Sequence, residues 1–250
     1  MDKKLSFASC GDEIAAVLGE PEEPNGRGVL LLHCFTCTKH HRVMRALSEC
    51  LVSSGFTTLR FDFSGNGESG GKLEDSTYTK MLSESYEAVS VLERRGIKRI
   101  GIAGHSMGAM LALLAASGDS RIRAVAFISG SSQAARVREV FPAEAIEKAE
   151  REGSAMAFVY GRDMLLKREF LQDVEKYNVG HAVATLERPL LIMHGTADEI
   201  IPPVHARQLF NWASGRKRLD LMEGADHLFR KEEHLGAVRE HMCEWFGEVL

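Results

Sequence analysis

The stretch Arg99-Ile100-Gly101-Ile102-Ala103-Gly104-His105-Ser106-Met107-Gly108 decides the fold of this chain. Its apolar start predicts a buried strand, and the Ala-, Leu- and Met-rich residues 107–117 predict a helix. Between them lies Gly-x-Ser-x-Gly, centred on Ser106. In a sharp strand-to-helix turn the flanking glycines let strand and helix approach closely, and the serine is held in a strained conformation. The sequence therefore predicts a Ser106 hydroxyl that projects above a sheet edge.

Outward from this turn, short apolar runs alternate with segments of helical periodicity. This alternation is typical of a mostly parallel, doubly wound sheet with helices on both faces, so we expect the α/β class. Residues 5–20 are expected to add one or two antiparallel edge strands. Buried strands are expected at 28–33, 57–63, 99–103, 124–129, 189–194 and 218–222, and helices at 40–53, 77–95, 107–117, 203–214 and 232–249.

Residues 131–187 interrupt the alternation. This segment is rich in Ala, Glu, Lys and Arg, lies between two expected core strands, and predicts two or three helices. We therefore expect residues 1–250 to form a single domain, with residues 131–187 as a small helical cap inserted between core strands.

Composition narrows the classes of function. The chain has 250 residues, of which 44% are hydrophobic, and a net charge of -4 without a basic block, so nucleic acid is not an expected partner. The N-terminal residues lack the apolar run of a signal peptide, and no stretch of 18 apolar residues occurs. The sequence predicts a cytoplasmic protein without a membrane span.

The five cysteines, at positions 10, 34, 37, 50 and 243, are expected to be reduced thiols, since a chain of this size does not need disulfides. Cys34 and Cys37 form a Cys-x-x-Cys pair, and with His33, His40 and His41 they offer five soft-metal ligands within nine residues. The second half of a structural zinc site is not apparent in the sequence. No metal is therefore predicted, and a redox or metal role of this group stays an open alternative.

Two further residues follow expected strands. Asp198 comes after the strand at 189–194, and His227 comes after the strand at 218–222. A serine nucleophile needs a base to accept its proton, and the base needs an acid to fix its tautomer. The order Ser106, Asp198, His227 is nucleophile, acid, base, as in α/β-hydrolases and unlike chymotrypsin or subtilisin.

The chain resembles, over nearly its whole length, the α/β-hydrolases of the serine esterase, monoacylglycerol lipase and serine aminopeptidase-like group. It is most similar to small bacterial or archaeal carboxylesterases, including those that cleave hydroxycinnamoyl esters. The matching segments are Leu32-His33-Cys34-Phe35-Thr36, Arg60-Phe61-Asp62-Phe63-Ser64-Gly65-Asn66-Gly67-Glu68-Ser69, Gly104-His105-Ser106-Met107-Gly108, His194-Gly195-Thr196-Ala197-Asp198 and Gly224-Ala225-Asp226-His227.

The resemblance implies an acyl-enzyme on Ser106 that water resolves, with no cofactor. It also implies that the backbone N–H groups of Phe35 and Met107 form the oxyanion hole. Where such proteins usually have glycine in the oxyanion loop, this chain has Cys34. Asp198 is preferred over the neighbouring carboxylates Glu199 and Asp226 because it occupies the matching position.

The other histidines are alternative bases. His33, His105 and His194 are expected to make structural hydrogen bonds, and His181 is a candidate substrate contact in the inserted segment. Asp62 is expected to pin the Gly-rich loop by accepting backbone hydrogen bonds.

The predicted function is a serine hydrolase that cleaves a small-molecule carboxylic ester. A lipid or thioester hydrolase ranks second and a serine aminopeptidase-like peptidase third. A non-catalytic ligand-binding module and a metal-binding interaction protein are the alternatives from other classes. The sequence leaves the natural substrate and the substrate-binding residues open, and exposed surface on the inserted segment is compatible with a homodimer. Apolar residues that could line an acyl pocket, or dock the cap on the core, are Val137, Val140, Phe141, Met156, Phe158, Val159, Tyr160, Met164, Leu165, Leu166 and Phe170.

Overall fold

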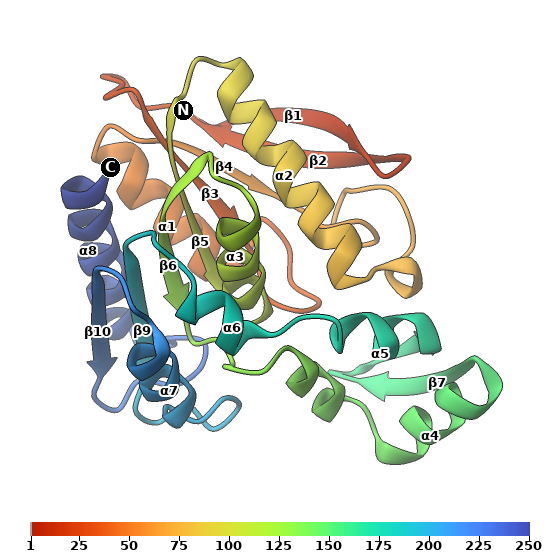
Figure 1. Ribbon diagram of the computed structural model, residues 1–250. Coiled ribbons are helices and arrows are strands. Elements are labelled where there is room, and N and C mark those ends of the chain that lie inside the picture. The colour runs from red at the N-terminus through yellow and green to blue at the C-terminus, as the bar shows by residue number, and fades with distance from the viewer. Residues whose placement is uncertain (1) are drawn as a thin grey trace.

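One eight-stranded sheet runs through the computed structural model, which describes residues 2–250 (Figure 1). Its strand order is β1-β2-β4-β3-β5-β6-β9-β10. β2 is antiparallel to both β1 and β4, and all other neighbours are parallel. The predicted fold class, the antiparallel strands at the N-terminus and five of the six expected buried strands are thus confirmed. The sixth, β10, is present but is the outermost strand of the sheet and is only partly buried. The strands are β1 (Asp2–Ser9), β2 (Asp12–Gly19), β3 (Arg27–Leu32), β4 (Thr57–Phe61), β5 (Arg99–His105), β6 (Ile122–Ile128), β9 (Leu190–Gly195) and β10 (Lys217–Met222).

Helices cover both faces of this sheet. Because side chains alternate along a strand, Val29 and Leu31 of β3 pack on one face, and Leu30 and Leu32 on the other. The first face is covered by α1 and α8, the second by α2, α3, α6 and α7 (Figure 1). The five predicted helices are therefore present, as α1 (Arg42–Ser53), α2 (Tyr78–Arg94), α3 (Met107–Gly118), α7 (Val204–Trp212) and α8 (Glu232–Val249).

The inserted segment, residues 131–187, differs from its prediction. It contains the predicted helices, but also an antiparallel two-stranded sheet of its own, which the sequence did not predict. The two strands meet at Tyr160 and Gly161, whose φ values are 49° and 81°, as a two-residue hairpin turn requires. The segment comprises η2 (Ala134–Val140), α4 (Ala143–Glu152), β7 (Ser154–Val159), β8 (Arg162–Lys167), α5 (Arg168–Val174) and α6 (Val179–Ala184).

The reason for this error lies in β7. Its buried positions are Ala155, Ala157 and Val159, so two of the three inward side chains are alanines, which favour helix. Among these inward positions only Val159 strongly favours a strand. The alternation of apolar and polar residues that indicates a strand is therefore weak in this segment. In Figure 1, α4, α5 and β7 form a lobe to one side of the main sheet.

The cysteines also differ from expectation. Cys34 and Cys37, whose Cα atoms are 5.3 Å apart across a turn, are joined by a disulfide, and Cys50 of α1 is paired with Cys243 of α8. The prediction of reduced thiols is therefore wrong for these four residues, because the turn and the packing of α1 against α8 bring their sulfur atoms together. Cys10 is free and exposed.

The longest helix, α8, has 18 residues and carries several charged side chains. Within residues 2–250, no helix combines the length and the apolar character needed to cross a lipid bilayer.

Candidate active site

Ser106 lies on a turn that the core fixes in place. It connects β5 to α3 and has φ 58° and ψ -118°, a strained conformation for a residue with a side chain. A Cβ added to Gly104 would lie 2.0 Å from the carbonyl oxygen of Gly108, and one added to Gly108 would lie 2.3 Å from that of Leu32. Both glycines are therefore required. Ten of the 12 residues of α3 are buried, so the serine is attached to an immobilised helix.

The structure brings Ser106, Asp198 and His227 together from three loops. The Nδ1 atom of His227 lies 2.8 Å from Oδ2 of Asp198, and its Nε2 atom lies 3.1 Å from Oγ of Ser106. Because an ionised carboxylate only accepts hydrogen bonds, Nδ1–H is the donor and Nε2 keeps its lone pair. The imidazole is thus oriented to accept the proton of the serine hydroxyl.

Asp198 is held by several donors besides His227. Its Oδ1 atom accepts hydrogen bonds from the N–H groups of Ile200 and Ile201, at 3.0 and 2.8 Å. Nε2 of His194 lies 3.2 Å from Oδ2 of Asp198 and donates to the carbonyl oxygen of Ile201 at 2.7 Å. Burial alone would raise the pKa of Asp198, but the hydrogen bonds from His194 and His227 outweigh it and hold the pKa well below its usual range. His194, expected to be structural, is therefore part of the acid's support, which its sequence position did not signal.

The neighbouring carboxylates have other contacts. Asp226 accepts hydrogen bonds from the backbone of Leu228 and Arg230, at 3.2 and 3.0 Å, and so shapes the turn after His227. Glu199 lines the cleft beside Ser106. His181 is exposed on α6 and does not line that cleft.

Phe35 and Met107, the predicted oxyanion donors, both line the cleft with Ser106. Met107 is the first residue of α3, so its N–H has no intrahelical acceptor. For the Phe35 N–H, no hydrogen-bond acceptor is found among residues 2–250. The oxyanion loop turns with Thr36 at φ 60° and a hydrogen bond from the Cys37 N–H to the Cys34 carbonyl at 3.1 Å. Cys34 itself has no positive φ, so the loop accommodates it without glycine.

Two buried histidines brace these loops. Nδ1–H of His33 donates to the Cys34 carbonyl at 2.8 Å, and Nε2 accepts from the Phe63 N–H at 3.1 Å. Nε2–H of His105 donates to the carbonyl of His227 at 2.8 Å. Burial lowers the pKa of His33 to about 4 and that of His105 to about 3, so both rings are neutral. Their structural roles agree with the prediction.

Asp62 anchors the Gly-rich loop. Its carboxylate accepts hydrogen bonds from the backbone N–H groups of Lys39, at 2.6 Å, and Glu68, at 2.9 Å. It also pairs with the buried ammonium group of Lys39. A Cβ on Gly67 would lie 2.1 Å from this carboxylate, so the glycine lets the loop wrap around it.

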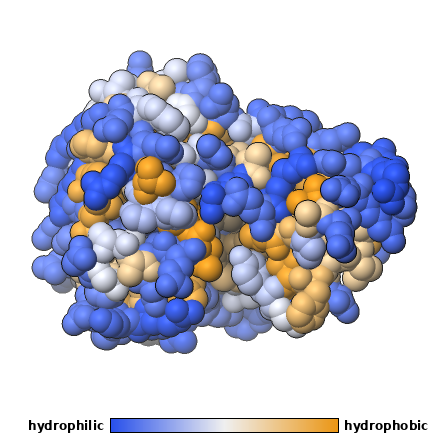
Figure 2. All heavy atoms as spheres, turned by 90° about the horizontal axis from the view of Figure 1, so that it is seen from below, coloured by the Kyte–Doolittle hydropathy of each residue, from blue (hydrophilic) through white to orange (hydrophobic). Residues whose placement is uncertain are grey.

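The cleft over Ser106 has a volume of about 410 Å³. The inserted segment forms much of its wall, and Figure 2 shows hydrophobic side chains on both sides of the hollow between this lobe and the main body. Arg136 and Glu139, an ion pair at 3.0 Å, supply charge to the wall. The apolar residues contributed by the inserted segment are Val137, Val140, Phe158, Val159 and Tyr160.

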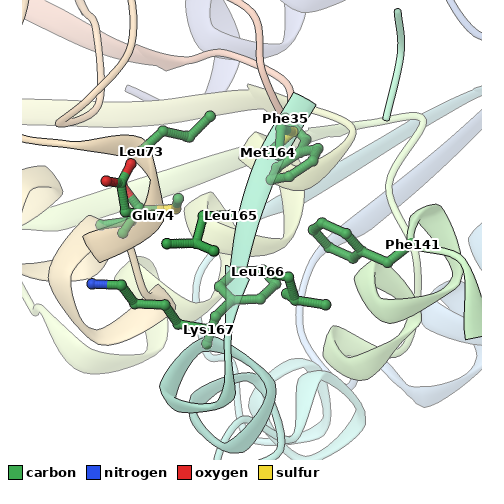
Figure 3. Close-up of a pocket in the computed structure, with 11 residues that line it drawn as sticks. Phe35, Leu73, Glu74, Phe141, Met164, Leu165, Leu166 and Lys167 are labelled. Carbon is green, nitrogen blue, oxygen red and sulfur yellow. The ribbon is translucent and has the colours of Figure 1, made fainter. Parts of the chain in front are cut away.

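Phe35 also lines a second hollow (Figure 3). It has a volume of about 20 Å³, enough for roughly one water molecule and too small for an acyl chain. Met164, Leu165 and Leu166 of β8 line it together with Phe141. These predicted pocket residues therefore pack the hairpin against the core, whereas those listed above face the cleft.

The order and direction of the strands, with helices on both faces of the sheet, are those of the α/β-hydrolase fold. The family model described as alpha/beta hydrolase fold matches residues 29–151. The esterase domain of a Rhodothermus marinus protein is 28% identical, with a TM-score of 0.77, and the match covers 98% of this chain and 97% of that one. Est1E from Butyrivibrio proteoclasticus, solved with ferulic acid bound, is 25% identical with a TM-score of 0.81 over 98% of this chain and 100% of its own.

Human palmitoyl-protein thioesterase ABHD10, a mitochondrial protein, is 27% identical over 200 residues, which are 74% of this chain and 64% of that protein. The chain spans about 63% of the length of the first curated relatives that it matches. The chain therefore has the α/β-hydrolase fold, and esterases are among the proteins that it is similar to.

Proposed function

We propose that this protein is a serine hydrolase that cleaves a carboxylic ester through an acyl-enzyme on Ser106. The observation that carries the proposal is the position of His227, whose ring nitrogens lie 3.1 Å from the serine oxygen and 2.8 Å from Asp198. The esterases among the similar proteins support the same class of reaction.

In the proposed mechanism, Nε2 of His227 takes the Ser106 proton as Oγ attacks the acyl carbonyl. The N–H groups of Phe35 and Met107 stabilise the resulting oxyanion. The imidazolium then gives its proton to the leaving alcohol, and the acyl-enzyme forms. A water molecule, deprotonated by the same imidazole, hydrolyses it and releases the carboxylic acid. Asp198 remains ionised throughout and stabilises the imidazolium.

Residues 131–187 act as the cap that selects the substrate. Five of their apolar side chains line the 410 Å³ cleft, and Arg136 and Glu139 add a polar wall. This lining favours a small ester with an apolar or aromatic acyl group. Thioester hydrolysis is the second candidate, because the same acyl-enzyme chemistry applies and the similar human protein is named as a thioesterase.

The test is a panel of p-nitrophenyl esters of increasing acyl length, together with a fluorophosphonate probe that labels activated serines. We expect labelling and turnover in the native chain, and loss of both in Ser106→Ala while the circular dichroism spectrum is kept. Acyl thioesters in the same assay rank the two substrate classes. A Ser106→Ala variant that hydrolyses esters at the native rate would refute the proposal, and so would a native chain that neither reacts with the probe nor turns over any substrate.

A further inference from the structure

Behind the catalytic residues lies a cluster that the proposed mechanism does not use. Sγ of Cys34 and one ring nitrogen each of His41 and His105 all lie within 4.8 Å of one another. Cys34 belongs to the oxyanion loop, His41 precedes α1, and His105 precedes the nucleophile. Cys34 and His41, seven residues apart, and the distant His105 thus bring one sulfur and two nitrogen ligands together.

The two imidazoles carry nitrogen atoms without partners. His105 is fully buried, and because its Nε2–H donates to a carbonyl, Nδ1 carries a lone pair. That Nδ1 atom has no hydrogen-bond partner within the described residues, and neither has the buried Nδ1 of His41. The two rings are nearly parallel, with an interplanar angle of 9°. Unsatisfied buried acceptors are unusual in folded proteins and are common where a metal ion binds.

We propose that Cys34, His41 and His105 form a Zn²⁺ site when the Cys34–Cys37 disulfide is reduced. A dithiol reductant supplies the two electrons and two protons that convert the disulfide to two thiols, and becomes a disulfide itself. Zn²⁺ then displaces the Cys34 proton and bonds to the thiolate and to the two neutral imidazoles. The disulfide blocks the site, since its sulfur lacks the negative charge of a thiolate ligand.

Cys37 is the natural fourth ligand. Reduction leaves its sulfur next to that of Cys34, and two thiolates with two imidazoles make a tetrahedral set that suits Zn²⁺. Ligand atoms of such a site lie roughly 3.4–3.6 Å apart, as the metal–ligand bond lengths imply. The cluster spacing of up to 4.8 Å therefore has to contract by only about 1 Å, within the reach of a loop released from its disulfide.

The test uses Co²⁺ as a spectroscopic probe on the full chain. The protein is reduced with a dithiol, freed of reductant under argon and titrated with Co²⁺. We expect a thiolate-to-Co²⁺ charge-transfer band and tetrahedral visible bands that saturate at about one equivalent, and that Zn²⁺ abolishes. The oxidised chain should show neither band. This readout does not depend on hydrolysis, so it stands or fails separately from the proposed function.

Variants identify the ligands. His41→Asn, at a half-buried position, should weaken Co²⁺ binding by more than about tenfold. Cys37→Ser frees the Cys34 thiol and should give the charge-transfer band without any reductant. The exposed neighbour substitution His40→Asn, and Cys50→Ser in the other cysteine pair, should leave binding unchanged. A reduced chain without the thiolate band, or equal affinity in His41→Asn, would overturn the proposal.

Discussion

On one side of the cleft, Ser106, Asp198 and His227 lie on three loops at the edge of the main sheet, each held by buried hydrogen bonds. On the other side, the hairpin β7–β8 presents Phe158 and Tyr160, which are 66% and 61% exposed, to the same space. The positions of the residues in the first region are fixed by many contacts, because four donors hold Asp198 and a buried helix carries Ser106. The second is a two-stranded unit whose outward residues could be exchanged without disturbing the core. Under the proposed function, the fixed side would carry out the reaction, and the exposed hairpin could vary with the substrate.

The largest expected effect is at the acid. Asp198→Asn should keep the fold but lower kcat on an ester by about 10⁴-fold, because an amide in place of the carboxylate favours the wrong tautomer of His227. Asp226→Asn, one residue before the histidine, is the matched control and should change kcat by less than about twofold, since this residue bonds only backbone groups and Arg230. Equal losses in the two variants would mean that the loop, rather than the acid, is what matters.

Acidification should lower the free energy of unfolding of the protein through two buried histidines near the cleft. His33 and His105 stay neutral in the fold at a pH where the unfolded chain already binds their protons, so the unfolded state is favoured as pH falls from about 6.5. Their contribution is fully present above that pH and is lost progressively down to about pH 4 for His33 and about pH 3 for His105. Each should lower the free energy of unfolding by about 1.4 kcal/mol per pH unit within its window. Urea denaturation at about pH 7 and about pH 5 measures this, and stability that rises on acidification would contradict it.

A smaller effect is expected at His194. His194→Leu removes a donor from Asp198, which should lower kcat about tenfold, in line with the energy of a hydrogen bond to a charged group. His194→Gln can keep a donor near the same position and should recover most of that loss. The acid limb of the pH profile should move in the Leu variant, because the carboxylate becomes easier to protonate. An unchanged profile with a general loss of stability would assign His194 a packing role alone.

The smallest effect is expected at the β7–β8 hairpin that lines the cleft. Phe158→Ala should raise KM for esters with long or aromatic acyl groups roughly threefold, with kcat nearly unchanged, since the ring is largely exposed and contributes only part of its area to binding. Met156→Ala, on the same strand but outside the cleft lining, is the control. A change in kcat in Phe158→Ala would show that the hairpin also positions the reacting atoms.

The sequence predicted the fixed region better than the wall. The Gly-x-Ser-x-Gly turn and the strand ends at Asp198 and His227 are local signals, so the three residues could be placed before their distances were known. The hairpin β7–β8 was missed because Ala155 and Ala157 give its buried face a helical composition. His194 as a second partner of Asp198 and the pairing of Cys50 with Cys243 depend on tertiary contacts that no local pattern carries.

The inserted segment occupies a place in the chain where it can be exchanged as one continuous block. It leaves the sheet at the end of β6 and returns at the start of β9, and these two strands are parallel neighbours. Parallel neighbours need a crossover connection, and α6, which packs on α3, already supplies one. Residues from η2 to α5 are therefore an insertion in a crossover connection that α6 completes. A recombinant chain in which this insertion is shortened or taken from a relative keeps every ladder of the main sheet, so new specificities can be sampled by exchanging one continuous block of sequence.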